Sequence, residues 1–243
     1  MHTVTPPFCA PSVWREQLRA QGYALIAPAD VEGWAQVSLT ELSALTETWS
    51  DLVPDAYLKD GGRYRQRRHS SYVVRGQQVQ LVPHRAHWQP LSYNALHGGM
   101  ERWFEPVNAG LEGLPAWHAL LVAAADAATT LRGEQTWFVE AHQFRIDTTD
   151  GIGRPTPEGA HRDGVDLVLV ALVQRHSVKG GETRVFDAHG PMGQRFTLTA
   201  PWSLMLLDDQ RVIHESTPIQ PEGDYGWRDT LVLTCRAGGF QDA

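Results

Sequence analysis

A series of short apolar segments in the second half of the chain constrains the fold more than any other feature. After Gly133, these segments alternate with turns that contain Gly, Pro or Asp. Short runs of β-branched and apolar residues bounded by turn residues are typical of β-strands. We expect strands at Thr136–Asp147, Asp166–Gln174, Glu182–Phe186, Arg195–Leu198, Ser203–Leu207, Val212–His214 and Thr230–Arg236. This spacing predicts a double-sheet jelly roll of the cupin kind, a double-stranded β-helix.

The first half of the chain has a mixed character. Apolar residues at three- and four-residue spacing predict helices, and alternating or short apolar runs predict strands. The expected helices are Ser12–Gln21, Ser38–Trp49 and Leu114–Arg132, and the expected strands are Tyr23–Ala27, Arg63–Val74 and Val79–Val82. We therefore predict one mainly β domain with flanking helices over residues 1–243, in which residues 1–132 pack on the sheet and residues 133–243 form the jelly-roll core.

Composition restricts the partners of the chain. Of its 243 residues, 42% are hydrophobic and 20% are charged, which is enough apolar material for a folded core. The formal net charge of −7 argues against a nucleic-acid or anionic-membrane partner. The longest apolar run, Leu167–Val173, is too short to cross a bilayer, and the two cysteines have no paired spacing. These features indicate a cytoplasmic protein, and its oligomeric state is not indicated.

A candidate metal site begins with His161 and Asp163. In an extended chain, residues two apart point to the same side, so an imidazole and a carboxylate can reach one ion. His214 follows a predicted strand and an Asp208-Asp209 turn, and it can supply a third ligand. Two histidines and one carboxylate on one face leave coordination positions open, which suits iron(II) that must bind an oxoacid and O₂ together.

A candidate anion site lies near the start of the last predicted strand. Arg228 and Thr230 are two residues apart and share a face of this strand. A guanidinium beside a hydroxyl is well suited to bind a carboxylate through two hydrogen bonds. A Gly180-Gly181 turn precedes a strand about twenty residues after the His161–Asp163 pair.

Several longer motifs together resemble the Fe(II)/2-oxoglutarate-dependent dioxygenases. The likeness extends from about Tyr57 to Thr234, and it is closest to the bacterial group that oxidises free amino acids, typified by L-isoleucine 4-hydroxylase. The motifs are Gly61-Gly-Arg-Tyr-Arg, Tyr93-Asn-Ala-Leu-His-Gly-Gly, Arg102-Trp-Phe-Glu-Pro, His142-Gln-Phe-Arg-Ile, Pro157-Glu-Gly-Ala-His-Arg-Asp-Gly and Arg228-Asp-Thr-Leu-Val-Leu-Thr.

The resemblance implies a cofactor set and a reaction. It implies that His161, Asp163 and His214 bind Fe(II), that Arg228 binds the distal carboxylate of 2-oxoglutarate, and that O₂ is the cosubstrate, with ascorbate as an activator. Related halogenases lack the carboxylate ligand, so Asp163 favours hydroxylation. The expected substrate is a small molecule, a free L-amino acid, with succinate and CO₂ as products. Two alternatives stay open: the same chemistry on a carrier-bound or peptidyl substrate, and a non-catalytic jelly-roll protein that keeps a metal for stability.

Further candidates could bind the substrate or the oxoacid. Arg63, Arg65 and Arg67 alternate, so on a strand they share a face and could bind an α-carboxylate, or they could form an ion-paired edge. Gln143 is a candidate for the oxoacid and Arg145 for the substrate, with hydrogen bonding at the core edge as the alternative.

Two acidic residues near the metal motif complete the candidates. Glu158 and Asp166 could bind an ammonium group. Alternatively, Glu158 caps a turn and Asp166 orients a metal ligand.

Overall fold

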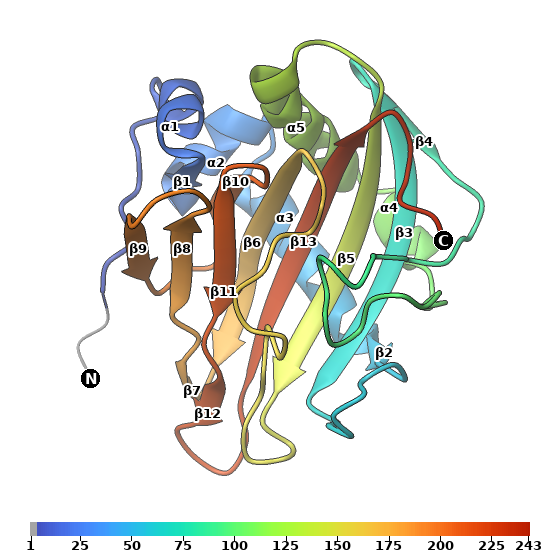
Figure 1. The fold of residues 1–243 in the computed structure, drawn as a ribbon, viewed down its shortest axis with the longest axis vertical. Coiled ribbons are helices and arrows are strands. Elements are labelled where there is room, and N and C mark those ends of the chain that lie inside the picture. Colours follow the sequence, from blue (N-terminus) through green and yellow to red (C-terminus); the bar gives the residue numbers. More distant parts are fainter. Residues whose placement is uncertain (1–3) are drawn as a thin grey trace.

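A large antiparallel sheet organises residues 4–243, which are the residues that the computed structural model describes. Within these residues the sheet has eight strands, in the order β1-β10-β6-β13-β5-β3-β2, with β4 paired to β3 (Figure 1). The strands are β1 (Tyr23–Ile26), β2 (Val53–Pro54), β3 (Arg65–Arg75), β4 (Gln78–Leu81), β5 (Trp137–Asp147), β6 (Leu167–His176), β10 (Ser203–Asp208) and β13 (Trp227–Ala237).

Two smaller sheets lie over one face of the large sheet, and the helices cover the other face (Figure 1). The smaller sheets have the orders β11-β8-β9 and β12-β7. Their strands are β7 (Val178–Gly180), β8 (Thr183–Asp187), β9 (Gly193–Phe196), β11 (Val212–Ser216) and β12 (Ile219–Pro221). The helices are α1 (Trp14–Gln21), α2 (Pro28–Ala35), α3 (Leu39–Thr46), the 3₁₀ helix η1 (Glu47–Asp51), α4 (Ala109–Glu112) and α5 (Pro115–Arg132).

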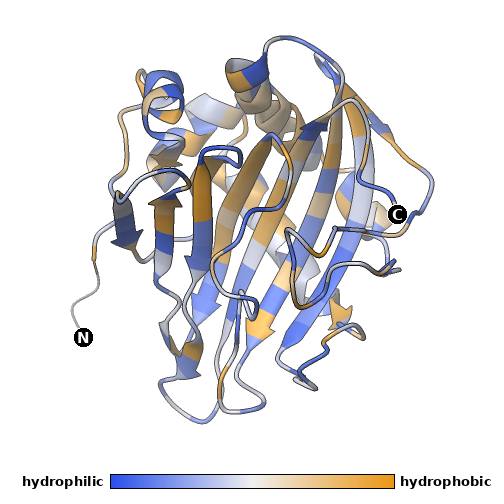
Figure 2. Cartoon of the chain, in the orientation of Figure 1, coloured by the Kyte–Doolittle hydropathy of each residue, from blue (hydrophilic) through white to orange (hydrophobic). Residues whose placement is uncertain are grey.

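Strand β6 is buried on both faces, which explains its continuous apolar sequence. Leu169, Ala171 and Val173 pack into the core between the large sheet and the helices. The alternate residues Val168, Val170 and Leu172 pack into a second core between the large and small sheets. A strand that is covered on both sides needs apolar residues at every position, and Figure 2 shows the resulting hydrophobic band along β6.

The prediction of a mainly β jelly-roll fold with flanking helices is confirmed. The first half of the chain does more than pack on the sheet, because β1 pairs with β10 and β3 pairs with β5. Helix α3 begins at a capping box in which the Ser38 hydroxyl and the Glu41 carboxylate each accept a backbone N–H of the other residue. Among the described helices, none has the length and apolar character needed to cross a membrane.

Candidate metal centre

His161 and His214 are brought together by backbone pairing. His161 lies in the loop between β5 and β6, and His214 is the central residue of β11. Each backbone N–H donates to the other residue's carbonyl oxygen, at 3.0 and 2.9 Å, so the two residues form an isolated antiparallel bridge. Directly paired residues place their side chains close together, and the ring centroids are 4.6 Å apart.

Asp163 completes the group, because its two carboxylate oxygens face the two imidazoles. Oδ1 lies 3.8 Å from Nε2 of His161, and Oδ2 lies 3.8 Å from Nε2 of His214. The loop that carries Asp163 is fixed by Asp209, whose carboxylate accepts the backbone N–H groups of Asp163, Gly164 and Val165 at 2.7 to 3.1 Å. These contacts give three potential ligand atoms around one shared space.

The environment of His214 favours the neutral imidazole that a metal requires, whereas His161 is oriented for a metal but lies beside two carboxylates. The Nδ1–H of His161 donates to the carbonyl oxygen of Gly159 at 3.0 Å, which leaves the Nε2 lone pair free for a metal. Burial and the neighbouring His161 lower the pKa of His214 to about 4. Burial alone would lower the pKa of His161, but the charges of Asp163 and Glu158 outweigh it and raise this pKa.

Arg228 is a buried cation beside the same cavity. Its side chain lies on β13 and is only 3% exposed, and its Nε has no hydrogen-bond partner among residues 4–243. Burial lowers its pKa to about 10. Within the same residues no salt bridge involves Arg228, because the adjacent carboxylate of Asp229 pairs with Arg145. A buried cation without a bound carboxylate is costly, so this position fits an anionic group.

The cavity that joins these residues is walled by alternate positions of three neighbouring strands. On β13 the lining residues are Arg228, Thr230, Val232 and Thr234; on β5 they are Glu140, His142, Phe144 and Ile146; on β3 they are Arg65 and Arg67. This alternation follows from the two-residue period of a strand. His161, Asp163 and His214 line the same cavity.

The sequence candidates divide into those that line the cavity and those that do not. Arg65, Arg67, Glu158, Arg228 and Thr230 line it, and Glu158 lies 3.4 Å from Nδ1 of His161.

Four candidates do not line the cavity, and this placement does not support the roles predicted for them. They are Arg63, Gln143, Arg145 and Asp166. Arg63 precedes β3, its side chain is 75% exposed, and it pairs with Asp150. Gln143 and Arg145 are on the opposite face of β5 from the cavity, because they share the parity of the core residues Val139 and Ala141.

The contacts of these residues are consistent with that placement. Gln143 donates to Thr48 at 2.9 Å, and Arg145 donates to both carboxylate oxygens of Asp229 at 2.7 and 2.8 Å. Asp166 accepts from Arg132 at 3.1 Å and from the backbone N–H of Ala237 at 2.8 Å.

Sequence reasoning missed several polar residues of this cavity. Gln89 donates to Oδ1 of Asp163 at 3.2 Å, and Arg102 donates to Oε1 of Gln89 at 2.9 Å. Both residues are in the loop-rich segment between β4 and α4, where no periodicity marks the inward face. Glu140 and His142 were detectable, because two polar residues alternate there with the core residues Val139 and Ala141.

An antiparallel jelly roll that holds two histidines and one carboxylate in its cavity is the arrangement of non-haem iron oxygenases. A family model for 2OG-Fe dioxygenases matches residues 46–234, and the chain therefore belongs to the 2OG-Fe dioxygenase family. Membership implies Fe(II), 2-oxoglutarate and O₂ as the metal and the cosubstrates. The His-Asp-His group, in which His214 is buried and the other two residues are half-buried, fits that set, and so does Arg228, which has no salt bridge within residues 4–243.

Solved structures resemble the chain over its whole length. A bsmA homolog from Methylobium petroleophilum PM1 is 52% identical, with 100% of this chain and 99% of that chain covered and a TM-score of 0.91. IDO from Bacillus thuringiensis is 17% identical, with coverage of 99% and 100% and a TM-score of 0.76. The Fe(II)/(alpha)ketoglutarate-dependent dioxygenase TqaL is 17% identical, with coverage of 96% and 90% and a TM-score of 0.69. No curated protein matches the chain.

Proposed function

We propose that the chain hydroxylates a free L-amino acid in a reaction that depends on Fe(II) and 2-oxoglutarate. The reaction consumes the substrate, 2-oxoglutarate and O₂, and it yields the hydroxylated substrate, succinate and CO₂. The observation that carries the proposal is one cavity that contains both a His-Asp-His group and a buried arginine without a salt-bridge partner among residues 4–243. The resemblance to the group of L-isoleucine 4-hydroxylase supports a free amino acid as the substrate.

In this proposal, each residue of the site has a separate task. His161, Asp163 and His214 hold the iron, and Arg228 with Thr230 binds the distal carboxylate of 2-oxoglutarate. When bound, the iron and 2-oxoglutarate supply the activation of O₂. The N–H donors to Asp209 keep the Asp163 loop in place, and Gln89 orients the Asp163 carboxylate. The apolar side chains of Val170, Met205 and Val232 keep water from the inner part of the cavity.

The proposal places the enzyme in the cytoplasm, with ascorbate keeping the iron reduced. Cys9 and Cys235 are buried and do not form a disulfide, which fits a reducing compartment.

A ligand substitution tests the metal assignment. We expect His214→Ala to abolish succinate formation from 2-oxoglutarate, because two ligands do not hold iron in a productive geometry. The exposed His118 on α5 provides the matched control, and His118→Ala should keep the activity. Succinate is measured with Fe(II) and ascorbate present. Full succinate production by His214→Ala would refute the assignment.

An amino-acid panel tests the substrate class and separates the rivals. The protein is incubated with Fe(II), 2-oxoglutarate and each free L-amino acid, and products with one added oxygen atom are detected by mass spectrometry. Oxidation of only carrier-bound or peptidyl amino acids would favour the rival substrate class. A protein that binds metal but never converts 2-oxoglutarate to succinate would be the non-catalytic alternative.

A further inference from the structure

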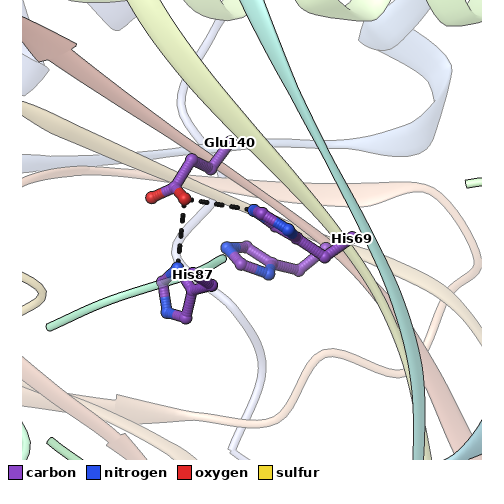
Figure 3. A group of neighbouring side chains, drawn as sticks. His69, His87 and Glu140 are labelled. Atoms are coloured by element: carbon purple, nitrogen blue, oxygen red, sulfur yellow. Dashed lines mark hydrogen bonds and ion pairs between the residues drawn. The ribbon is translucent and has the colours of Figure 1, made fainter. Parts of the chain in front are cut away.

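A second group of buried polar residues lies on the β3–β5 side of the cavity. Oε1 of Glu140 is 3.1 Å from Nε2 of His69 and 3.1 Å from Nδ1 of His87 (Figure 3). Together with His142, these side chains place potential ligand atoms within 4.8 Å of one another. They therefore form either a second metal site or a network of hydrogen bonds.

The hydrogen-bond partners favour the network. An ionised carboxylate only accepts, so both the His69 Nε2 and the His87 Nδ1 must carry a proton. A guanidinium only donates, and Nη2 of Arg67 is 2.7 Å from Nδ1 of His142, so the His142 lone pair is already used. The two nitrogens that face Glu140 thus carry protons, and the Nδ1 lone pair of His142 is used by Arg67.

The network holds Arg67 in a fixed position. His142 accepts a hydrogen bond from Arg67 and stacks on His69, with ring centroids 4.6 Å apart. The guanidinium of Arg67 also lies over the rings of Phe104 and Phe144, at 3.6 and 4.4 Å from their centroids. Such contacts orient a buried arginine without neutralising its charge.

Positive charge exceeds negative charge around Arg67. Arg65, Arg67 and Arg102 are all buried, and Arg65 donates to Asp55 at 2.7 Å while Arg67 is 3.8 Å from the same carboxylate oxygen. Arg85 lies 3.7 Å from Glu140, so this carboxylate is also shared. Within residues 4–243, Nε of Arg67 and Nε of Arg102 have no hydrogen-bond partner. Buried guanidinium groups with free donors fit an anionic ligand.

This excess of charge is close to the proposed iron ligands. Gln89 bridges the two regions, because its Nε2 donates to Asp163 at 3.2 Å and its Oε1 accepts from Arg102 at 2.9 Å. One amide side chain therefore separates Arg102 from Asp163. A carboxylate held at Arg102 would leave the carbon chain of a small acid beside the iron.

We propose that Arg67 and Arg102 bind the free carboxylate of the substrate, so that the cavity selects a free acid over an amide, ester or thioester. This inference rests on the proposed function and deepens it, because an amino acid that is bound to a carrier through its carboxyl group, or that precedes another residue in a peptide, lacks that carboxylate. Arg228 is left for 2-oxoglutarate, and Glu140 with its two histidines acts as a positioning group for Arg67.

Calorimetric titration without oxygen tests the carboxylate subsite. The protein loaded with Fe(II) and 2-oxoglutarate is titrated with L-leucine, L-isoleucine and L-methionine, and with the amide of each. We expect the best free acid to bind at least about tenfold more tightly than its amide, because hydrogen bonds between charged groups are lost in the amide.

Substitutions locate the preference for the acid. Arg102→Gln should weaken binding of the acid by about 10- to 100-fold and change binding of the amide by less than about threefold. Arg102→Lys keeps a cation and should recover part of the preference. Arg75, exposed at the other end of β3, is the matched control, and Arg75→Gln should keep the full preference. A merely unfolded variant would lose both ligands equally.

Three results overturn the inference. The first is equal affinity for acid and amide, and the second is the absence of binding by every acid. The third is the binding of two equivalents of Co(II), one of which is lost in His87→Ala, because the cluster would then be a metal site. The titration is repeated without iron and 2-oxoglutarate, so it decides the subsite even if the protein forms no succinate. Failure of the proposed function is thereby a separate result.

Discussion

Arg228 is the side chain on which the proposed 2-oxoglutarate site depends. It is buried, it lies on the same face of β13 as Thr230, and no residue in the described part of the chain forms a salt bridge with it. We expect Arg228→Gln to raise the KM for 2-oxoglutarate by about 10- to 100-fold, because a charge-assisted pair of hydrogen bonds is removed. Arg228→Lys should be intermediate, since lysine restores the charge without the planar fork. The measurement is succinate formation against 2-oxoglutarate concentration, and an unchanged KM would exclude this role.

The two regions of charge in the cavity differ in how their residues are held. Arg228 has no salt bridge within residues 4–243, whereas Arg67 is oriented by His142 and two aromatic rings. Rigid support lowers the entropy cost of binding a ligand. Because the substrate must be placed accurately beside the iron, we assign its carboxylate to the region around Arg67 and not to Arg228.

At the scale of elements, the turn between β7 and β8 supports Arg228. Gly181 has φ +68°, and a Cβ there would lie 3.1 Å from Cγ2 of Ile219 and 3.6 Å from Cδ of Arg228. We expect Gly181→Ala to lower the free energy of unfolding by about 1–3 kcal/mol, because the strain of a positive φ is added to the close contact with Ile219. The same substitution should raise the KM for 2-oxoglutarate, because Ile219 must move and the new methyl group contacts the side chain of Arg228.

Gly76 offers a matched control for this turn. It also has a positive φ, +55°, but a Cβ there would meet no atom within 4 Å. Gly76→Ala should therefore show the backbone strain without a change in the KM. Urea unfolding and succinate kinetics on both variants give the comparison. Equal effects of the two substitutions on the KM would contradict a specific role for the turn at Gly181.

The strands were largely predictable, whereas the direction of their side chains was predicted only in part. The stretches predicted at Thr136–Asp147 and Thr230–Arg236 correspond to β5 (Trp137–Asp147) and to most of β13 (Trp227–Ala237). On β13 the pair Arg228 and Thr230 does line the cavity. On β5, however, Gln143 and Arg145 follow the parity of buried core residues, and the apolar side of that strand was the signal that would have placed them away from the cavity.

The contribution of loops to the site could not be derived from periodicity. Gln89 and Arg102 reach the cavity from a segment without long regular elements, and their positions depend on tertiary contacts such as the backbone pairing of His87 with Arg102. Such pairing between distant loops leaves no repeating pattern in a single sequence. The His161–His214 bridge is of the same kind, and only its residue types made it detectable.

At the scale of the whole molecule, the two halves of the sequence share one sheet. Strand β3 from the first half pairs with β5 along almost its full length, and together they carry Arg67, His142 and Glu140. Strand β13, near the end of the chain, pairs with β5 on its other side. The cavity therefore depends on long-range pairing, so substitutions in the first half should affect binding as well as stability. The assignment of residues 1–243 to one domain stays a prediction.

The buried histidines predict how the stability of the whole molecule depends on pH. Burial lowers the pKa of His87 and of His214 to about 4, from an ordinary value of 6.5. Below pH 6.5 the unfolded chain takes up protons that the folded chain does not, so the free energy of unfolding falls as the pH drops from 6.5 to about 4. The raised pKa of His161 acts in the opposite direction and offsets part of this loss.

His87→Asn isolates one contribution to this acid sensitivity. Asparagine can still donate a hydrogen bond to Glu140 but does not titrate, so the variant should lose less stability than the unaltered protein between pH 7 and pH 5. The lowering of the His87 pKa from 6.5 to about 4 corresponds to a loss of stability on the order of 3 kcal/mol when the pH falls across that range. Urea unfolding at several pH values measures the slope, with the exposed His118→Asn as the control. A histidine that is neutral in the folded chain and protonated in the unfolded chain must make stability depend on pH. If the free energy of unfolding changes with pH equally in His87→Asn and in the unaltered protein, His87 does not contribute to the acid sensitivity.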